Sequence, residues 1–364
     1  MTILLSMILQ LAATLPAGIG ENLVGTGRSG DSGDGGPAPK ARLNAPFDVA
    51  YDRKGNLYVS DTENHRIRRV DAKSGTISTI AGTGRKGFLG DGGPATAARL
   101  NEPYGLAIDD EGSVYFADRL NRRVRKVDGR SGTIVTVAGG VGKVFSGDGG
   151  AADKAGLVEP NGVALDGKGG LLIADVADHR VRRVDLKSGR ITTFAGDGKA
   201  KHSGDGGAAS DCSIFGARAV EVGPDGTVFI LERQGNTLRS VDPKTGTINT
   251  IAGTGKKGYS GDGGPAISAT FNGPKELAVD RLGNVYIVDT ENHAIRRIDH
   301  ATGLITTVAG DGKAPAKGTD PGDRLDRPHG VAIAPSGRIV IGDSGNHRVR
   351  AVSVPGSAKI NESP

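Results

Sequence analysis

The sequence predicts an all-β fold, a six-bladed β-propeller whose blades are four-stranded antiparallel sheets. The first observation is a Gly-Asp-Gly-Gly tetrapeptide that recurs every 57 residues, with its aspartates at Asp34, Asp91, Asp148, Asp205 and Asp262. The second is an acidic position with the same spacing, which gains a sixth copy after a shorter step of 54 residues; its members are Asp61, Asp118, Asp175, Glu232, Asp289 and Asp343. No linker interrupts these units, so they predict one closed domain.

Each unit has the pattern of a four-stranded meander. In the second unit we expect strands at residues 105–109, 113–118, 122–128 and 133–138, separated by glycine-containing turns. The segment between units is too long for a plain turn, and residues 94–100 suit one or two helical turns with Pro94 at the first helical position. The aspartate of Gly-Asp-Gly-Gly is expected to accept backbone N–H groups in an Asx-turn.

The two ends of the chain predict how the ring closes. Residues 18–27 align with residues 75–84 at the repeat spacing, so they form a fourth strand without the three that normally precede it. The last unit ends after its third strand, at residues 347–354. The N-terminal strand therefore completes the last blade, which removes two open sheet edges. The predicted propeller covers residues 18–355, followed by a tail at 356–364.

The composition restricts the classes of function. A single cysteine, Cys212, excludes an intrachain disulfide framework and a cysteine-cluster metal site. The 46 Lys and Arg against 41 Asp and Glu give a net charge of +5, and the two signs are interspersed, which does not indicate nucleic acid. Residues 1–17 are uncharged and mostly apolar, too short for a stable membrane span, and typical of a signal peptide. We therefore expect a secreted or periplasmic protein.

Three segments carry a family resemblance. Residues 61–71 (DTENHRIRRVD), 103–107 (PYGLA) and 283–289 (GNVYIVD) resemble the signature of NHL repeats. The GDGGPA-type repeat is similar to that of bacterial exported NHL proteins and of the teneurin propeller. The resemblance implies a six-bladed propeller but no single activity, because the family includes scaffolds, protein- or RNA-binding modules and a peptide-amidating lyase. The fourth unit departs most from the pattern, at residues 216–219 and 232–237.

Two sets of recurrent side chains are interpreted as framework. One is an arginine seven residues after each acidic position, expected to form a partly buried ion pair; the set is Arg68, Arg125, Arg182, Arg239, Arg296 and Arg350. The other is a histidine in four of the second-to-third strand turns, at His65, His179, His293 and His347. These turns lie far apart in a propeller, so we expect the histidines to pack the turns and not to share a metal ion.

The candidate site is the mouth of the axial channel, where the residue types differ from one repeat to the next. The two residues after the repeat proline differ in every unit, are mostly polar, and should surround the mouth because first strands line the axis. The candidate ligand-binding residues are Asp48, Tyr104, Asn161, Arg218, Lys275, Glu276 and His329.

These residues favour a binding or scaffold module for a protein or a small polar or anionic ligand. We expect no catalysis and no cofactor, and we expect the protein to be a monomer. Phe47 and Tyr104 are too few aromatic residues for a nucleic-acid stacking platform. The alternative is a metal-dependent lyase or lactonase. A zinc lyase would need three axial histidines and only His329 is present. Asp48, Asn161 and Glu276 could hold calcium, although Arg218 and Lys275 disfavour a cation there.

Overall fold

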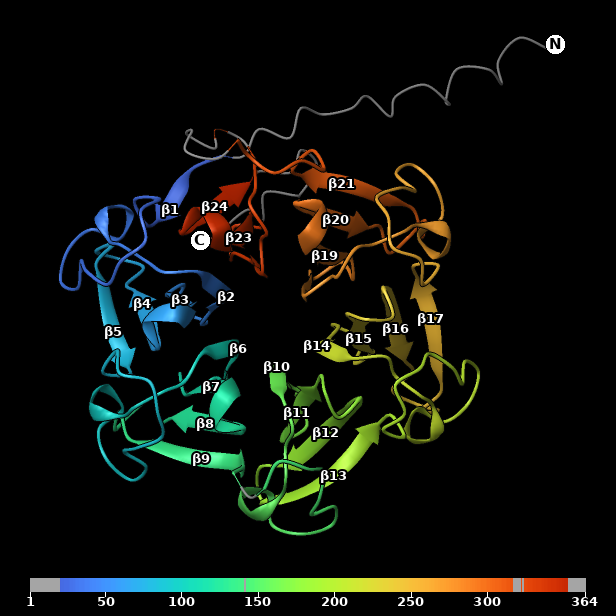
Figure 1. The fold of residues 1–364 in the computed structure, drawn as a ribbon, viewed down its shortest axis with the longest axis horizontal. Coiled ribbons are helices and arrows are strands. Elements are labelled where there is room, and N and C mark those ends of the chain that lie inside the picture. The colour runs from blue at the N-terminus through green and yellow to red at the C-terminus, as the bar shows by residue number, and fades with distance from the viewer. Residues whose placement is uncertain (1–19, 141, 317–321, 323, 353–364) are drawn as a thin grey trace, which may run out of the picture.

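Six four-stranded antiparallel sheets surround a central axis in the computed structural model, which describes residues 20–140, 142–316, 322 and 324–352 (Figure 1). The predicted signal peptide (1–17) and tail (356–364) lie outside the described residues, as do the two ends of the predicted propeller. Within the described part of the chain, no helix is long and apolar enough to span a membrane. The predicted all-β fold is confirmed.

Each blade runs from an inner first strand to an outer fourth strand. Blade 1 contains β2 (Pro46–Tyr51), β3 (Leu57–Asp61), β4 (Arg66–Val70) and β5 (Ile77–Ala81). Blade 2 contains β6 (Pro103–Ile108), β7 (Val114–Asp118), β8 (Arg123–Val127) and β9 (Ile134–Gly139). Blade 3 contains β10 (Pro160–Leu165), β11 (Gly170–Asp175), β12 (Arg180–Asp185) and β13 (Arg190–Ala195). The strands of blade 2 lie within two residues of the predicted bounds.

The second half of the ring repeats this order. Blade 4 contains β14 (Ala217–Val222), β15 (Val228–Glu232), β16 (Thr237–Val241) and β17 (Ile248–Ala252). Blade 5 contains β18 (Glu276–Val279), β19 (Val285–Asp289), β20 (Ala294–Ile298) and β21 (Ile305–Ala309). Blade 6 contains β22 (Gly330–Ile333), β23 (Ile339–Asp343) and β24 (Arg348–Val352), and its fourth strand is β1 (Asn22–Val24).

The predicted ring closure is confirmed by the pairing of β1 with β24. The two strands are antiparallel, with Asn22 opposite Arg350 and Val24 opposite Val349 (Figure 1). Val24 is fully buried in the core between blades 6 and 1, beside Leu43, Val340 and Val349. The N-terminal strand therefore contributes both backbone hydrogen bonds and apolar contacts to the closed ring.

In the part of the chain that the structure describes, short 3-10 helices occupy two kinds of connection. Five lie between blades: η1 (Ala38–Lys40), η3 (Ala95–Ala97), η5 (Ala152–Lys154), η6 (Ala209–Asp211) and η7 (Ala266–Ser268). Four lie between second and third strands: η2 (Thr62–Asn64), η4 (Arg119–Asn121), η8 (Thr290–Asn292) and η9 (Ser344–Asn346). Pro94 is at the N-cap of η3 with φ −60° and ψ 129°, so it precedes the helix and does not begin it as predicted. Its fixed φ suits the extended turn that starts the helix.

The core lies between neighbouring blades and is built from small and branched aliphatic residues. Between blades 2 and 3, Leu157 from the connecting loop packs with Leu171, Ile173 and Ile191, and all four are fully buried. The alanines of the inner and second strands let the sheets approach each other closely near the axis, where a propeller has least room. Removing this apolar surface from water supplies the main favourable free energy of folding.

The repeated arginines connect each blade to the loop that precedes it. Arg125 is fully buried, and its guanidinium contacts Asp118 Oδ2 at 3.3 Å and Asp91 Oδ1 at 2.6 Å. The predicted ion pair is thus present, but Asp91 from Gly-Asp-Gly-Gly is a second partner that the sequence analysis missed. The expectation that this aspartate serves an Asx-turn is corrected: its described hydrogen bonds go to Arg125 and to the Thr136 hydroxyl.

Blade 3 differs from the other blades in this network. Arg182 contacts Asp148 Oδ1 at 2.5 Å, but no ion pair with Asp175 is present among the described residues. Asp175 instead accepts hydrogen bonds from the backbone N–H groups of Val158 and Glu159, both at 2.7 Å. In the other five blades, the arginine contacts the acid seven residues before it at 3.3 or 3.2 Å, or 3.4 Å in blade 5.

The four turn histidines join neighbouring blades. Each has a left-handed backbone conformation, with φ between 51° and 57°. His65 Nδ1 accepts the backbone N–H of Glu102 at 3.2 Å, and His347 Nδ1 accepts that of Ala45 at 3.1 Å, across the ring closure. In blade 4, Asn236 stands at this position and accepts the N–H of Gly273 at 2.9 Å. The histidines therefore pack the turns as predicted, through one defined hydrogen bond each.

Candidate functional site at the axial mouth

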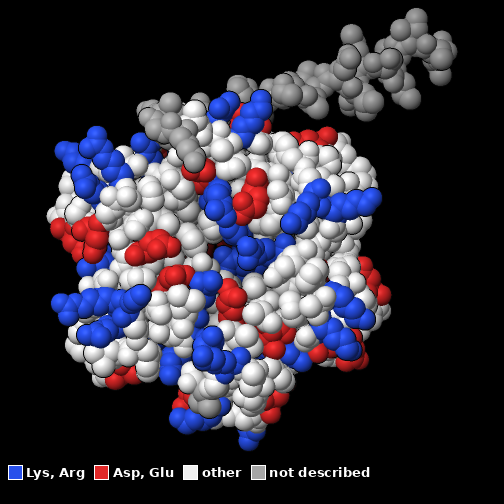
Figure 2. Space-filling view, viewed as in Figure 1, with Lys and Arg blue, Asp and Glu red and all other residues white. Residues whose placement is uncertain are grey.

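The six residues that follow the repeat proline surround one end of the central channel. They lie at or just before the start of the inner strands β2, β6, β10, β14, β18 and β22, on the face that carries the second-to-third strand turns (Figure 1). Figure 2 shows the same face, where Lys and Arg side chains gather at the centre of the ring. The predicted position of the mouth agrees with this arrangement.

Contacts link these six side chains into one continuous row. Lys275 Nζ lies 2.8 Å from His329 Nε2, and the His329 ring stacks on Phe47 with centroids 3.9 Å apart and planes at 12°. Phe47 in turn contacts Tyr104, with ring centroids 4.7 Å apart. Arg218 extends this row to Asn161, because its guanidinium contacts both Tyr104 and Asn161. Residues of different blades are thus held in a single layer.

Arg218 is the exceptional charge in this layer. Its guanidinium carbon lies 4.8 Å from the Tyr104 ring centroid, and its Nη1 donates to Asn161 Oδ1. The side chain is only 8% exposed, and no carboxylate lies within 4.0 Å of it in the described part of the chain. Burial lowers the pKa of this guanidinium, and the negative charge of Glu276 opposes this shift only in part.

Lys275 and His329 form the second basic element. The His329 Nδ1–H donates to the carbonyl oxygen of Arg327 at 2.8 Å, so Nε2 carries the lone pair and accepts from the Lys275 amine. Burial, and then the nearby positive charge of Lys275, lowers the pKa of His329 well below its usual value. Burial and the charge of Arg218 lower the pKa of Lys275 to about 7, while Glu291, at 3.4 Å, opposes this shift.

Two other arginines near the mouth, Arg119 and Arg327, are paired with carboxylates. Arg119 pairs with Glu102 and Glu159, and its guanidinium lies 4.9 Å from the Tyr104 ring centroid. Arg327 pairs with Glu291 at 2.8 Å. The positive charge that remains for a ligand is therefore carried by Arg218 and Lys275 in the mouth layer and by the exposed Arg233, whose charge helps to lower the pKa of both.

Below the mouth, the channel becomes acidic. Asp48, Glu221 and Glu276 line a cavity of about 200 Å³ inside the ring of inner strands. Asp48 accepts the backbone N–H groups of Val49 at 2.8 Å and Leu106 at 2.7 Å. Burial raises the pKa of Asp48 and that of Glu221 to about 7, and burial together with the negative charge of Asp48 raises the pKa of Glu276 well above its usual value.

Glu221 was missed by the sequence analysis, although the sequence contains a signal for it. The other five units have alanine at this repeat position: Ala50, Ala107, Ala164, Ala278 and Ala332. This position comes two residues after the second of the two mouth residues, and in blades 1, 4, 5 and 6 it lines the channel cavity. A single acid among five alanines at a channel-facing position marks Glu221 as part of the axial layer.

The predicted cation set is only partly assembled. Asp48 and Glu276 line the same cavity, but the Asn161 side-chain oxygen accepts a hydrogen bond from the guanidinium of Arg218, so it is engaged by a positive charge that disfavours a cation. Within the described ranges, no group of three or more His, Cys, Asp or Glu side chains is arranged to hold a metal ion. The residues present thus fit an anion at the mouth better than a calcium ion.

The fold and the repeated motif together define a six-bladed β-propeller of repeat type, and comparison with known sequences identifies the repeat. The profile described as "NHL repeat" matches residues 43–70 and 325–351, and the profile described as "Teneurin NHL domain" matches residues 84–146 and 254–321. The chain belongs to the NHL-repeat family.

Individual relatives are distant and mostly longer. "Protein SUPPRESSOR OF QUENCHING 1, chloroplastic" of Arabidopsis thaliana is 30% identical over 76% of this chain and 27% of its own length. "NHL repeat-containing protein 2" of Bos taurus is 27% identical over 75% of this chain and 42% of its own length. The chain therefore spans less than half of these curated relatives. Among solved structures, an auxiliary nutrient binding protein from Bacteroides thetaiotaomicron superposes with a TM-score of 0.64 at 18% identity, covering 91% of this chain and 75% of the other, which shows a shared fold.

Proposed function

We propose that this propeller is a binding module that takes an anionic group at its axial mouth. One observation carries the proposal: Arg218 is a buried cation without a carboxylate partner among the described residues. A buried charge that lacks its partner is costly, and the cost is removed when a ligand brings the opposite charge. A carboxylate or phosphate fits the planar donor fork of a guanidinium.

The surrounding residues favour recognition of such a group. Lys275 supplies a second positive charge when it is protonated, and Phe47 and Tyr104 supply apolar surface beside it. All of these side chains are fixed by contacts with one another on rigid strands, so little conformational entropy is lost when a ligand binds. The anion is either a small polar metabolite or an acidic side chain of a partner protein.

The same charge opposes the alternative of a metal-dependent lyase or lactonase. A cation at the level of Asn161 would lie beside Arg218, and two like charges at short distance repel each other. We therefore propose that the protein binds its ligand without catalysis and acts as a monomer.

The uncharged residues 1–17 support the further proposal that the protein is exported. N-terminal sequencing of protein recovered from periplasm or medium tests export, and an intact N-terminus in the cytosolic fraction would contradict it.

Calorimetric titration with inorganic phosphate, succinate and a short polyglutamate peptide tests the binding proposal. At least one of these probes should bind saturably to the parent protein, and its affinity should fall at least tenfold in Arg218→Met. The matched control is Arg130→Met, which removes an exposed arginine from a turn distant from the mouth. Equal affinity of both variants and the parent for every probe would contradict the proposal.

Metal analysis of the purified protein tests the alternative. One equivalent of calcium or zinc, together with lactone or amide-lyase turnover that is lost in Glu276→Gln, would replace the binding proposal with an enzymatic one. Turnover without dependence on Glu276 would instead indicate a contaminating enzyme.

A further inference from the structure

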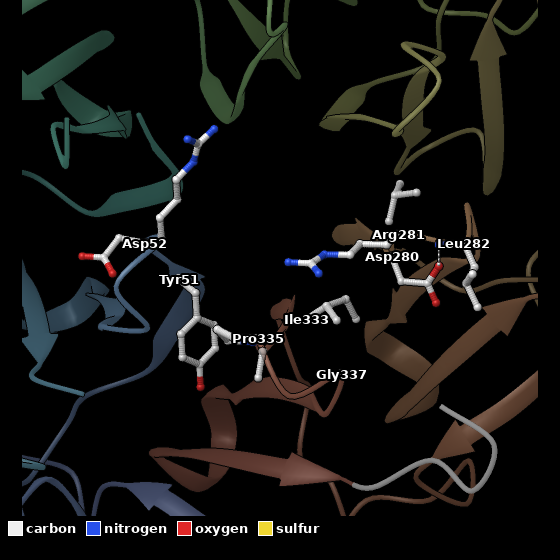
Figure 3. Close-up of a pocket in the computed structure, with 11 residues that line it drawn as sticks. Tyr51, Asp52, Asp280, Arg281, Leu282, Ile333, Pro335 and Gly337 are labelled. Carbon is white, nitrogen blue, oxygen red and sulfur yellow. Dashed lines mark hydrogen bonds between the residues drawn. The ribbon is translucent and has the colours of Figure 1, made fainter. Parts of the chain in front are cut away.

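A second hollow lies on the face opposite the mouth, where the turns between first and second strands emerge. Its volume is about 810 Å³, and it lies among these turns in blades 1, 5 and 6 (Figure 3). The lining consists of residues 51–53 of blade 1, 279–282 of blade 5, and 333–335 with Gly337 of blade 6. A volume of this size suits a small organic molecule. The hollow shares no lining residue with the mouth layer.

The hollow forms where blade 6 departs from the repeat. Blades 1 and 5 have an aspartate at the start of this turn, Asp52 and Asp280, whereas blade 6 has Ala334 followed by Pro335. The backbone of the turn is unchanged: Gly337 N–H donates to the Ala334 carbonyl at 2.8 Å, as Gly55 N–H does to that of Asp52 at 3.0 Å. The substitution therefore removes a carboxylate without altering the turn, and leaves this side of the hollow apolar.

The two aspartates that remain are occupied by their own turns. Asp280 Oδ1 accepts the backbone N–H groups of Leu282 and Asn284, both at 2.9 Å. Its Oδ2 accepts from the Asn284 amide at 2.8 Å and from the Tyr286 hydroxyl at 3.2 Å. Asp52 makes the equivalent four hydrogen bonds in blade 1. These carboxylates are fixed in the turns and have few lone pairs left for a ligand.

One arginine is directed into the hollow. Arg281 extends from blade 5 toward Tyr51 on the opposite side, as Figure 3 shows. No hydrogen bond or ion pair holds its guanidinium within the parts of the chain that the structure describes. Arg53, at the same repeat position in blade 1, instead pairs with Asp110 at 2.6 Å. The hollow thus offers one unpaired guanidinium.

Apolar surface lies beside that guanidinium. Ile333 and Pro335 of blade 6 and Val279 of blade 5 line the hollow, and Leu282 at its rim is 69% exposed, a high value for leucine in a folded protein. We infer that the hollow binds an amphipathic organic anion, whose acidic head group pairs with Arg281 and whose apolar body covers the aliphatic side chains of blades 5 and 6. Each half of such a ligand meets a surface that is otherwise left in water.

Fluorescence titration with 8-anilinonaphthalene-1-sulfonate, an anionic aromatic probe, tests this inference, with decanoate as competitor. Decanoate should displace the probe, whereas acetate, which lacks the apolar body, and decanol, which lacks the charge, should each compete at least tenfold more weakly. Arg281→Met keeps the aliphatic stem but removes the charge, and should raise the dissociation constant of the probe at least tenfold.

Ala334→Asp is the second variant, because it restores the aspartate that blades 1 and 5 carry in the same turn and should therefore fold. This variant places a carboxylate at the apolar side of the hollow and should also weaken the binding of the probe at least tenfold. Arg130→Met should leave probe affinity unchanged, and any probe binding that is lost in Arg218→Met belongs to the mouth and not to this hollow. Unaltered binding in both Arg281→Met and Ala334→Asp, at unchanged melting temperature, would overturn the inference, as would equal competition by decanol and decanoate.

Discussion

Two buried arginines of this propeller, Arg125 and Arg218, occupy opposite kinds of environment. Arg125 lies between two carboxylates, Asp118 and Asp91, in an arrangement that recurs around the ring. Arg218 has an amide oxygen and a tyrosine ring for neighbours and no counterpart in any other blade. Residue type and burial are the same, so the difference lies in the pairing. A paired buried charge stabilises the framework, and an unpaired one marks a place that a ligand can complete.

The comparison predicts a large loss of stability when the paired arginine is removed. Arg125→Met leaves the fully buried Asp118 without its cation, which should lower the free energy of unfolding by about 3–5 kcal/mol. Chemical denaturation measures this loss. Arg130→Met, in an exposed turn, should change it by less than about 0.5 kcal/mol. Equal stability of the two variants would show that the repeated ion pairs do not hold the blades together.

The acidic axial layer should have the opposite effect on stability, because its ionised carboxylates destabilise the folded state. The pKa of Glu221 is raised to about 7 by burial, so the native protein binds more protons than the unfolded chain between about pH 4.5 and 7. Stability contributed by this group is therefore present at low pH and lost as the pH rises through that range.

Glu221→Gln cannot ionise and should be more stable than the parent at pH 8, by about 1–3 kcal/mol, with no difference near pH 4. Melting curves across this pH range measure the effect, with the exposed Glu111→Gln as control. A variant that is less stable than the parent at pH 8 would show that the Glu221 carboxylate has a stabilising partner in the channel.

Anion binding at the mouth should depend on pH through Lys275. Because its pKa is lowered to about 7, the amine is mostly protonated at pH 6 and mostly neutral at pH 8, and affinity for an anion should fall about tenfold over this interval. Titrations with the best probe at both pH values measure this change. Lys275→Arg, which stays charged, should show a smaller fall in affinity than the parent, with the part that remains due to the carboxylates below the mouth, Asp48 and Glu221. A parent protein whose affinity is flat between pH 6 and 8 would contradict the assignment.

The smallest expected effect concerns the hydrogen bonds between blades. Burial lowers the pKa of His347, whose Nδ1 accepts the Ala45 N–H, so this bond is present above the usual histidine pKa and is lost as the pH falls. His347→Asn imitates Asn236 of blade 4, which keeps an acceptor at the same place. Because the asparagine acceptor does not titrate, His347→Asn should lose less stability than the parent between pH 7 and pH 5, with a difference of less than about 1 kcal/mol. The measurement is the fall in melting temperature over this pH range, which should be smaller in the variant. A fall as large as that of the parent would show that this bond does not contribute.

Much of the fold could be predicted because its signals are periodic. The 57-residue spacing gives the number of blades, and the unpartnered fourth strand at residues 18–27 gives the closure. The partner of Asp91 could not be predicted, because 34 residues separate it from Arg125 and spacing says nothing about where a loop side chain points. The row of contacts at the mouth could not be predicted from the sequence either. Whether Lys275 reaches His329 depends on the radius of the ring and on side-chain rotamers, which no repeat pattern contains.

The pairing of β1 with β24 gives the ring a seam. Every other blade is one continuous stretch of chain, whereas this one joins segments more than 300 residues apart. The joining strand is three residues long, so it pairs with its neighbour over a shorter length than the five-residue outer strand β5 of blade 1. A mechanical load applied between the two ends of the propeller therefore acts on this short strand first. Tension would separate β1 from β24 and open the ring within blade 6, while the other five blades keep all four strands of their sheets paired.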